Sequence, residues 1–295
     1  MLSILGAALV TGMLAVELTG RRAQFTAALH AAPVWILSFT VMLQIVSLIA
    51  RTEAWNVCVR ATGATVPRRL LFRAAGVGYL FSLLNGSLGL AARIASLRRA
   101  APETSPRIPA LLAAELPIIG VEAMLAAVFS FTLVGPLGIA WWLPAIAVAI
   151  AAGVMIALSR LSDQSRVGLC AGLAVMRSGR RRMIALVLLA VCAQIARNWL
   201  VLRGIGVHVS LLDAVALLIA IFTLGQLPIG PSLGAAAAVV ILGAHGFPTV
   251  AAAGVLLTAT ATVGSLIYAA RAVIDRLFTR NPAATPEGGL APSRA

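Results

Sequence analysis

The chain has 295 residues, of which 61% are hydrophobic and 11% charged, and its mean hydropathy is +1.01. This composition excludes a soluble domain and indicates an integral membrane protein, with room for about six to eight helical crossings and for no separate folded domain. All 23 basic residues are arginines, against 9 acidic residues, so the formal charge of +14 must lie in loops or in a functional cavity, and nucleic-acid binding is the poorer explanation.

Stretches with few or no charged residues predict the elements that lie within the membrane. They are found at roughly 1–19, 31–50, 74–92, 108–134, 139–159, 183–203, 211–244 and 249–270. The first has no basic residue before its apolar run, so we interpret it as a first helix and not as a cleaved signal peptide. The cysteines are scattered and form no CxxC pair, so neither a disulfide framework nor a zinc site is predicted.

Two of these stretches contain breaks that a regular crossing helix would not contain. The 31 residues from Ala214 to Ala244 carry no charge. As a helix they would span about 46 Å, too long for one upright crossing and too short for two. Their middle, residues 228–234, holds two prolines and two glycines, so a hairpin that enters the bilayer and returns fits best. The stretch 74–92 is broken at residues 85–89, and its length alone does not decide between a crossing and a hairpin.

The placement of the arginines favours two re-entrant hairpins. With both broken stretches re-entrant and a cytoplasmic N-terminus, 19 arginines lie in cytoplasmic segments and three lie outside. If all eight stretches crossed, 10 arginines would be cytoplasmic and 12 would lie outside. Because positively charged loops are typically cytoplasmic, we predict six crossings, two hairpins, and both termini on the cytoplasmic side of the cell membrane. One local conflict is that Arg21 and Arg22 would lie outside.

The two broken stretches also resemble each other. Residues 87–92 align with 232–237 at an offset of 145, and the pattern RxxGxxV at 60–66 recurs at 203–209, an offset of 143. Each half would have an odd number of crossings, so the second half would start on the opposite side. We therefore predict an all-α integral membrane protein of two inverted repeats, 1–135 and 136–272, with about six transmembrane helices, two re-entrant helical hairpins and a disordered cytoplasmic tail at 273–295. This plan is typical of secondary transporters.

Arginines in apolar surroundings are the first candidates for a functional site. A guanidinium inside a membrane protein costs several kcal/mol unless it is paired or hydrated, and its planar fork of donors suits phosphate. Arg197 is the most deeply placed, and it should either bind a lipid phosphate or carboxylate or pair with Glu115 or Glu122. Arg51 and Arg93 lie at the cytoplasmic ends of their elements, where snorkelling to the interface is the alternative to a role in the site.

The acidic residues and the hairpin breaks supply the other candidates. Glu115 and Glu122 are seven residues apart, so they should share one helix face, either paired with arginine or protonated and suited to proton coupling. Exposed backbone N–H groups at the breaks can bind an anion, unless the side chains there only satisfy the broken backbone. Those side chains are Asn85, Ser87, Gln226 and Ser232.

The order of these features resembles the flippase-like transmembrane domain of the lysylphosphatidylglycerol synthase family over roughly residues 33–270. Arg51-x-x-x-Trp55 is similar to the family's Arg/Trp ending of an early helix, residues 84–93 to its LPGRLGE..R segment, and residues 228–234 to its PxxPGGxGxxE segment. Asn85, Leu90 and Ala237 stand where the family has proline, glutamate and glutamate. The soluble aminoacyl-transfer domain is not found, so the resemblance does not imply lipid aminoacylation.

Two functions fit this pattern. We expect a transporter that moves an anionic lipid, or a polyprenyl-phosphate-linked sugar, between leaflets. The alternative is a non-transporting scaffold that binds such a lipid for a partner such as a glycosyltransferase or a lipid-modifying enzyme. No catalytic set is visible, and no cofactor or metal is predicted. We expect the two hairpin tips to face each other across one cavity, with the substrate bound by Arg51, Asn85, Ser87, Arg93, Arg197, Arg203, Gln226 and Ser232.

Overall fold

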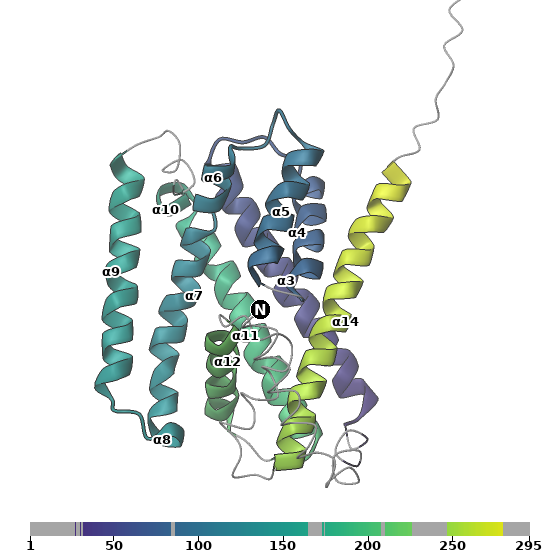
Figure 1. Cartoon of the computed structure of the whole chain (residues 1–295), viewed down its shortest axis with the longest axis vertical. Helices are drawn as coiled ribbons and strands as arrows, with labels where there is room; N and C mark the ends of the chain where they lie inside the picture. Colours follow the sequence, from purple (N-terminus) through teal and green to yellow (C-terminus); the bar gives the residue numbers. More distant parts are fainter. Residues whose placement is uncertain are drawn as a thin grey trace, which may run out of the picture.

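The computed structural model of the chain is a bundle of α-helices (Figure 1). It describes residues 27, 30, 32–83, 86–164, 173, 175–207, 210–225 and 247–279. The elements in chain order are α3 (Val34–Ala61), α4 (Arg68–Ser82), α5 (Gly86–Ala100), α6 (Ile108–Ala113), α7 (Leu116–Phe129), the 3-10 helix η1 (Ser130–Leu133), α8 (Val134–Leu137), α9 (Trp142–Gln164), α10 (Val175–Ser178), α11 (Arg180–Gly204), α12 (Leu211–Gly225) and α14 (Phe247–Thr279).

Five segments of the described chain are long and apolar enough to cross a membrane. They are Val34–Ala61, Ile108–Leu133, Trp142–Ser162, Arg180–Gly204 and Ala252–Arg271. At about 1.5 Å per residue, each reaches the ~30 Å of a bilayer's hydrocarbon core. The prediction of an all-helical membrane protein is confirmed for this part of the chain. The predicted first helix, residues 1–19, lies outside the described residues.

Arginines gather at one end of the bundle. The upper end in Figure 1 holds the chain connections after α3, α5 and α9 and the C-terminal part of α14. Most described arginines lie at or near this end, which we call the arginine-rich end: Arg60, Arg68, Arg69, Arg98, Arg99, Arg107, Arg160, Arg180, Arg181, Arg182 and Arg271. Arg203, in the last turn of α11, lies at the opposite end.

The first predicted hairpin is formed by α4 and α5, whose outer ends both lie at the arginine-rich end (Figure 1). Each helix has 15 residues, or about 22 Å, which is shorter than a crossing. Helix α4 ends at Ser82 and α5 begins at Gly86, so residues 86–89 of the predicted break are helical. Two glycines let the helices approach closely, because a Cβ added to Gly78 would lie 2.9 Å from the carbonyl oxygen of Gly89. Of the second predicted hairpin only the first part, α12, is described, and residues 228–234 lie outside the described chain.

Helices α3 and α11 form the centre of the bundle and pack on each other along much of their length. The hydroxyl of Ser47 on α3 donates to the carbonyl oxygen of Ala190 on α11 at 3.1 Å. Around them lies a buried core that includes Trp55, Leu71 and Met183. Helices α4 and α14 lie on one side of the central pair, and α7 lies on the other side (Figure 1). Helix α9 packs on α7 at the periphery of the bundle.

Three boundaries differ from the sequence prediction, and the first is the end of α3, which runs to Ala61 and not to residue 50. The stretch 108–134 is interrupted, because Pro117 at the start of α7 has no N–H to continue the ladder from α6. Glu115 therefore sits at a joint between α6 and α7, and not on one continuous helix with Glu122. Helix α14 runs to Thr279, so the first residues of the predicted tail 273–295 are helical.

Candidate functional site

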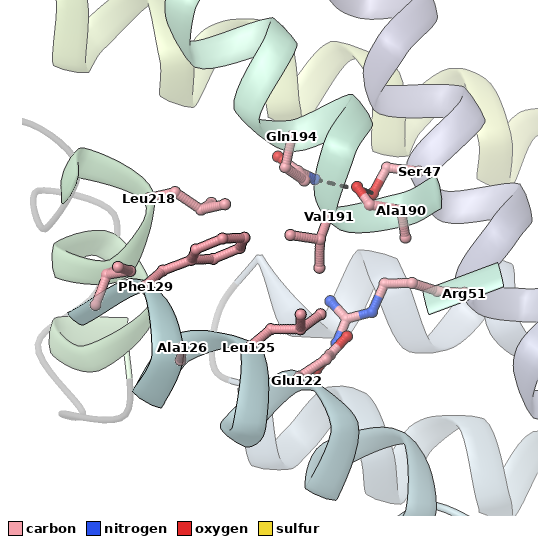
Figure 2. A pocket seen from close by; sticks show the side chains of 11 residues that line it. Ser47, Arg51, Glu122, Leu125, Ala126, Phe129, Ala190, Val191, Gln194 and Leu218 are labelled. Carbon is pink, nitrogen blue, oxygen red and sulfur yellow. Dashed lines mark hydrogen bonds and ion pairs between the residues drawn. The ribbon is translucent and has the colours of Figure 1, made fainter. Parts of the chain in front are cut away.

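A cavity of about 230 Å³ lies between α3, α7, α11 and α12, beside the crossing of the two central helices (Figure 2). Its walls are mostly apolar, with a few polar side chains from α3, α7 and α11. The lining residues are Ser47, Arg51, Glu122, Leu125, Ala126, Phe129, Ala190, Val191, Gln194, Leu218 and Ile219. An apolar cavity with a small number of polar groups is the usual form of a site for an organic ligand.

One side of the cavity carries an ion pair. Nη2 of Arg51 donates to Oε2 of Glu122 at 2.7 Å, and Figure 2 shows the two side chains pointing toward each other. The Arg51 side chain is 42% exposed, whereas the Glu122 side chain is 9% exposed. The carboxylate thus uses one nitrogen of a guanidinium that remains accessible. Among the described residues this guanidinium forms no other hydrogen bond, so the rest of its donor fork could bind an anion from the cavity.

Apart from the ion pair, the polar side chains that line the cavity are neutral. Nε2 of Gln194 donates to Oγ of Ser47 at 3.2 Å and to Oε1 of Gln44 at 3.0 Å. Gln44, Ser47 and Arg51 follow one another on α3 at spacings of three and four residues, which places them on one helix face. The sequence analysis singled out only Arg51 of these residues, although this spacing within an apolar run could have identified the other two.

Arg197 lies behind the cavity and not in its wall. It is 6% exposed, and its Nη1 donates to Oε1 of Gln44, the same oxygen that accepts from Gln194. No acidic side chain in the described chain pairs with it, and its Nε has no hydrogen-bond partner there. The pairing with Glu115 or Glu122 that the sequence analysis gave as an alternative is therefore not formed.

The second predicted carboxylate forms a closed ion pair elsewhere. Nη2 of Arg93 on α5 donates to Oε1 of Glu115, and both side chains are almost buried. The guanidinium carbon of Arg93 lies 4.4 Å from the ring centroid of Trp55, which is completely buried on α3. This contact joins three elements in the core and lies outside the cavity lining. Arg93 therefore neither extends to the membrane interface nor offers its guanidinium to a ligand in the cavity.

The remaining predicted site residues are not brought to the cavity by the described chain. The guanidinium of Arg203 stacks over Trp199 at 4.5 Å, near the opposite end of α11. Ser87 lies in the first turn of α5, and the position of its side chain is not described. Asn85, Gln226 and Ser232 lie outside the described residues, as does the second of the two tips that were predicted to face each other, whereas residues 86–89 of the first tip form the start of α5.

A cluster of three hydroxyls on the other side of α3 was not predicted. The Tyr268 hydroxyl on α14 donates to Oγ1 of Thr52 at 2.9 Å, and Oγ1 of Thr52 lies 3.3 Å from the hydroxyl of Tyr79 on α4. The rings of Tyr79 and Tyr268 meet edge to face with centroids 5.4 Å apart. These residues are far apart in the chain and share no motif, so only the packing of the helices reveals the cluster.

Comparison with known proteins does not identify a relative. No family model matches the chain, and neither a curated protein nor a solved structure matches it. Function is therefore inferred from the cavity, its charged groups and the helices that build them.

Proposed function

We propose that this protein moves an anionic lipid, or a polyprenyl-phosphate-linked sugar, between the leaflets of a cell membrane. The observation that supports this best is an accessible guanidinium, Arg51, in a mostly apolar cavity beside three segments that can cross a bilayer, those of α3, α7 and α11. A phosphate would bind the free side of the donor fork. Leu125, Phe129 and Leu218 would contact the adjoining acyl or prenyl chain.

Glu122 gives the empty cavity a compensating charge. An uncompensated arginine in apolar surroundings is costly, so an arginine without a ligand needs a counter-ion. When a phosphate arrives, it competes with the buried carboxylate for the Arg51 guanidinium. The site would then hold two anions and one guanidinium, so Glu122 would take up a proton as the phosphate binds, with the neutral side chains of Ser47 and Gln194 close by.

We also propose that the two halves of the chain are inverted repeats and that α4 and α5 form a re-entrant hairpin. The contact between Ser47 and Ala190 supports the repeat, because these residues are equivalent at the offset of 143. A residue that touches its own equivalent lies beside a two-fold axis. The shortness of α4 and α5 supports re-entry. On this proposal the arginine-rich end is cytoplasmic, and the plan agrees with the resemblance to the flippase-like domain.

The test is transport by purified protein in liposomes. Phosphatidylglycerol with a fluorescent label would be placed in one leaflet, with labelled phosphatidylcholine as the zwitterionic comparison, and a membrane-impermeant quencher would report the leaflet. Arg51→Gln is expected to slow phosphatidylglycerol transfer by about tenfold or more, since a hydrogen bond to a charged group is worth about 1.5–3 kcal/mol. Arg203→Gln, which alters an arginine remote from the cavity, is the matched control.

Three outcomes would separate the candidate functions. Transfer that depends on Arg51 and not on Arg203 supports the proposal. Equal transfer by wild-type protein and Arg51→Gln would contradict it. Tight retention of the labelled lipid by wild-type protein without movement between leaflets would instead favour the non-transporting scaffold.

A further inference from the structure

We infer that the contact between α3, α4 and α14 is a closed gate, and that it opens when the cavity on the other side of α3 closes. We call the residues Thr52, Tyr79 and Tyr268 the hydroxyl gate. This inference rests on the proposed transport and on the proposed inverted repeat. It predicts a second state of the protein, in which Arg51 is reached from the side of α14.

The proposed repeat allows the packing of the gate to be compared with the packing of the cavity. One buried cluster of the core consists of Leu48, Ala75 and Tyr268. At the offset of 143, which relates the segments before the hairpin break, Leu48 and Ala75 are equivalent to Val191 and Leu218, and both of these line the cavity. At the offset of 145, which relates the segments after it, Tyr268 is equivalent to Ala123, which directly follows Glu122 of the cavity wall in the chain. Equivalent segments therefore meet twice, once around an open space and once tightly packed. Two equivalent interfaces in different states are what transport by alternating access requires.

The polar residues of the cavity lie where both states could share them. Ser47 is equivalent to Ala190, and Arg51 is equivalent to Gln194, again at the offset of 143. All four residues line the cavity, so its polar part lies beside the proposed axis. Thr52 directly follows Arg51 on α3. A ligand held by Arg51 could therefore stay in place while the apolar wall on one side closes and the wall on the other side opens.

The hydroxyls fit a gate better than a permanent core. Phenylalanine would fill the same space, as Phe72 does beside Tyr268, and a hydroxyl in an apolar interface is costly unless it is bonded. In the closed state each of the three hydroxyls has a partner, and Thr52 also donates to the carbonyl of Leu48 at 2.8 Å. Once α14 moves away, the same hydroxyls can bond to water or a headgroup, so the opened interface is less apolar than it would be with phenylalanine at these positions.

Helix α14 sits directly against α3 in the closed state, which allows the gate to be locked. A Cβ added to Gly264 would lie 3.0 Å from Cβ of Gln44, close to the ~3.8 Å typical of a disulfide. We would introduce Gln44→Cys and Gly264→Cys in protein whose three native cysteines are replaced by alanine. Oxidation is expected to stop transfer of labelled phosphatidylglycerol in liposomes, and reduction by dithiothreitol to restore it.

A second measurement does not depend on Gln44. Ser265→Cys places a thiol at a buried position of α14 beside the gate, and Ser162→Cys, equally buried on α9, is its control. Labelling by a water-soluble maleimide is expected to rise several-fold for Ser265→Cys in phosphatidylglycerol liposomes relative to phosphatidylcholine liposomes. The control should label at the same slow rate in both. If the reduced double-cysteine protein is itself inactive, the disulfide experiment cannot test the gate, and this labelling comparison tests it instead.

The results distinguish failure of the gate from failure of transport. Full transfer by the oxidised protein, or an unlabelled Ser265→Cys thiol while transfer proceeds, would overturn the gate and leave the proposed function intact. Wild-type protein that moves no lipid would overturn both.

Discussion

Arg51 and Arg197 are both arginines in apolar surroundings, yet their charges are balanced in different ways. Arg51 has the Glu122 carboxylate, whereas Arg197 has only the neutral amide of Gln44 among the described residues. A buried charge without a counter-ion lowers stability, so a residue of this kind is more easily explained by function than by folding. The chain Arg197, Gln44, Gln194 and Ser47 also connects this charge to the cavity.

This difference leads to a prediction for the pair Arg197 and Gln44. The double substitution Arg197→Met with Gln44→Leu removes both partners together, so no polar atom of either is left without a bond. The midpoint of thermal unfolding in detergent should stay the same or rise, while phosphatidylglycerol transfer falls about tenfold, the effect of one charge-assisted hydrogen bond. Stability and transfer both equal to those of wild-type protein would show that Arg197 has no part in transport.

The sequence identified the individual charged residues better than their partners. Glu122 and Arg51 were each singled out because charge is rare in apolar stretches, and both line the cavity. Their pairing depends on how α3 packs beside α7, 71 residues away, and no local pattern encodes that contact. For the same reason Glu115, which was one of two alternative ion-pair partners considered for Arg197, is found with Arg93.

At the scale of elements, the apolar stretches predicted the positions of α3, α7, α9, α11 and α14, because a crossing helix is set by length and hydropathy. The ends of α3 and α14 were predicted too early, since these helices continue through charged residues to Ala61 and Thr279. The break in the stretch 74–92 was predicted at residues 85–89, whereas α4 ends at Ser82 and α5 already begins at Gly86, so the predicted position is a few residues too late. What sequence did not reveal is the close contact that makes this hairpin compact. Gly78 and Gly89 face each other across the two helices, and their spacing in the sequence does not predict this contact.

The hairpin contact can be tested by one methyl group. A Cβ at position 78 would lie 2.8 Å from Cβ of Arg93 and 2.9 Å from the carbonyl oxygen of Gly89. Gly78→Ala is therefore expected to lower the free energy of unfolding by about 1–3 kcal/mol. Gly153→Ala on α9 is the matched control, since its Cβ would meet nothing within 4 Å. The control should be neutral or stabilising by up to about 1 kcal/mol, and equal effects of the two variants would contradict the contact.

At the scale of the whole molecule, the arginines give the bundle two unlike ends. Single cysteines at Thr104 and Ser178, both exposed at the arginine-rich end, should be protected from a membrane-impermeant thiol reagent in intact cells. A cysteine at Ser210, exposed at the opposite end, should be labelled. Labelling of Thr104→Cys from outside would reverse the proposed orientation.

The joint at Glu115 has a mechanical consequence for the whole bundle. Arg93 fixes the chain at Glu115, and Pro117 weakens the helix directly after it, so α7 can pivot about an anchored end. With 14 residues, α7 is a lever about 20 Å long, and a tilt of about 10° would displace its far end by about 4 Å. Phe129 at that far end lines the cavity. A small rotation about the pivot would therefore widen or narrow the cavity while the Arg93 and Trp55 contact stays at rest.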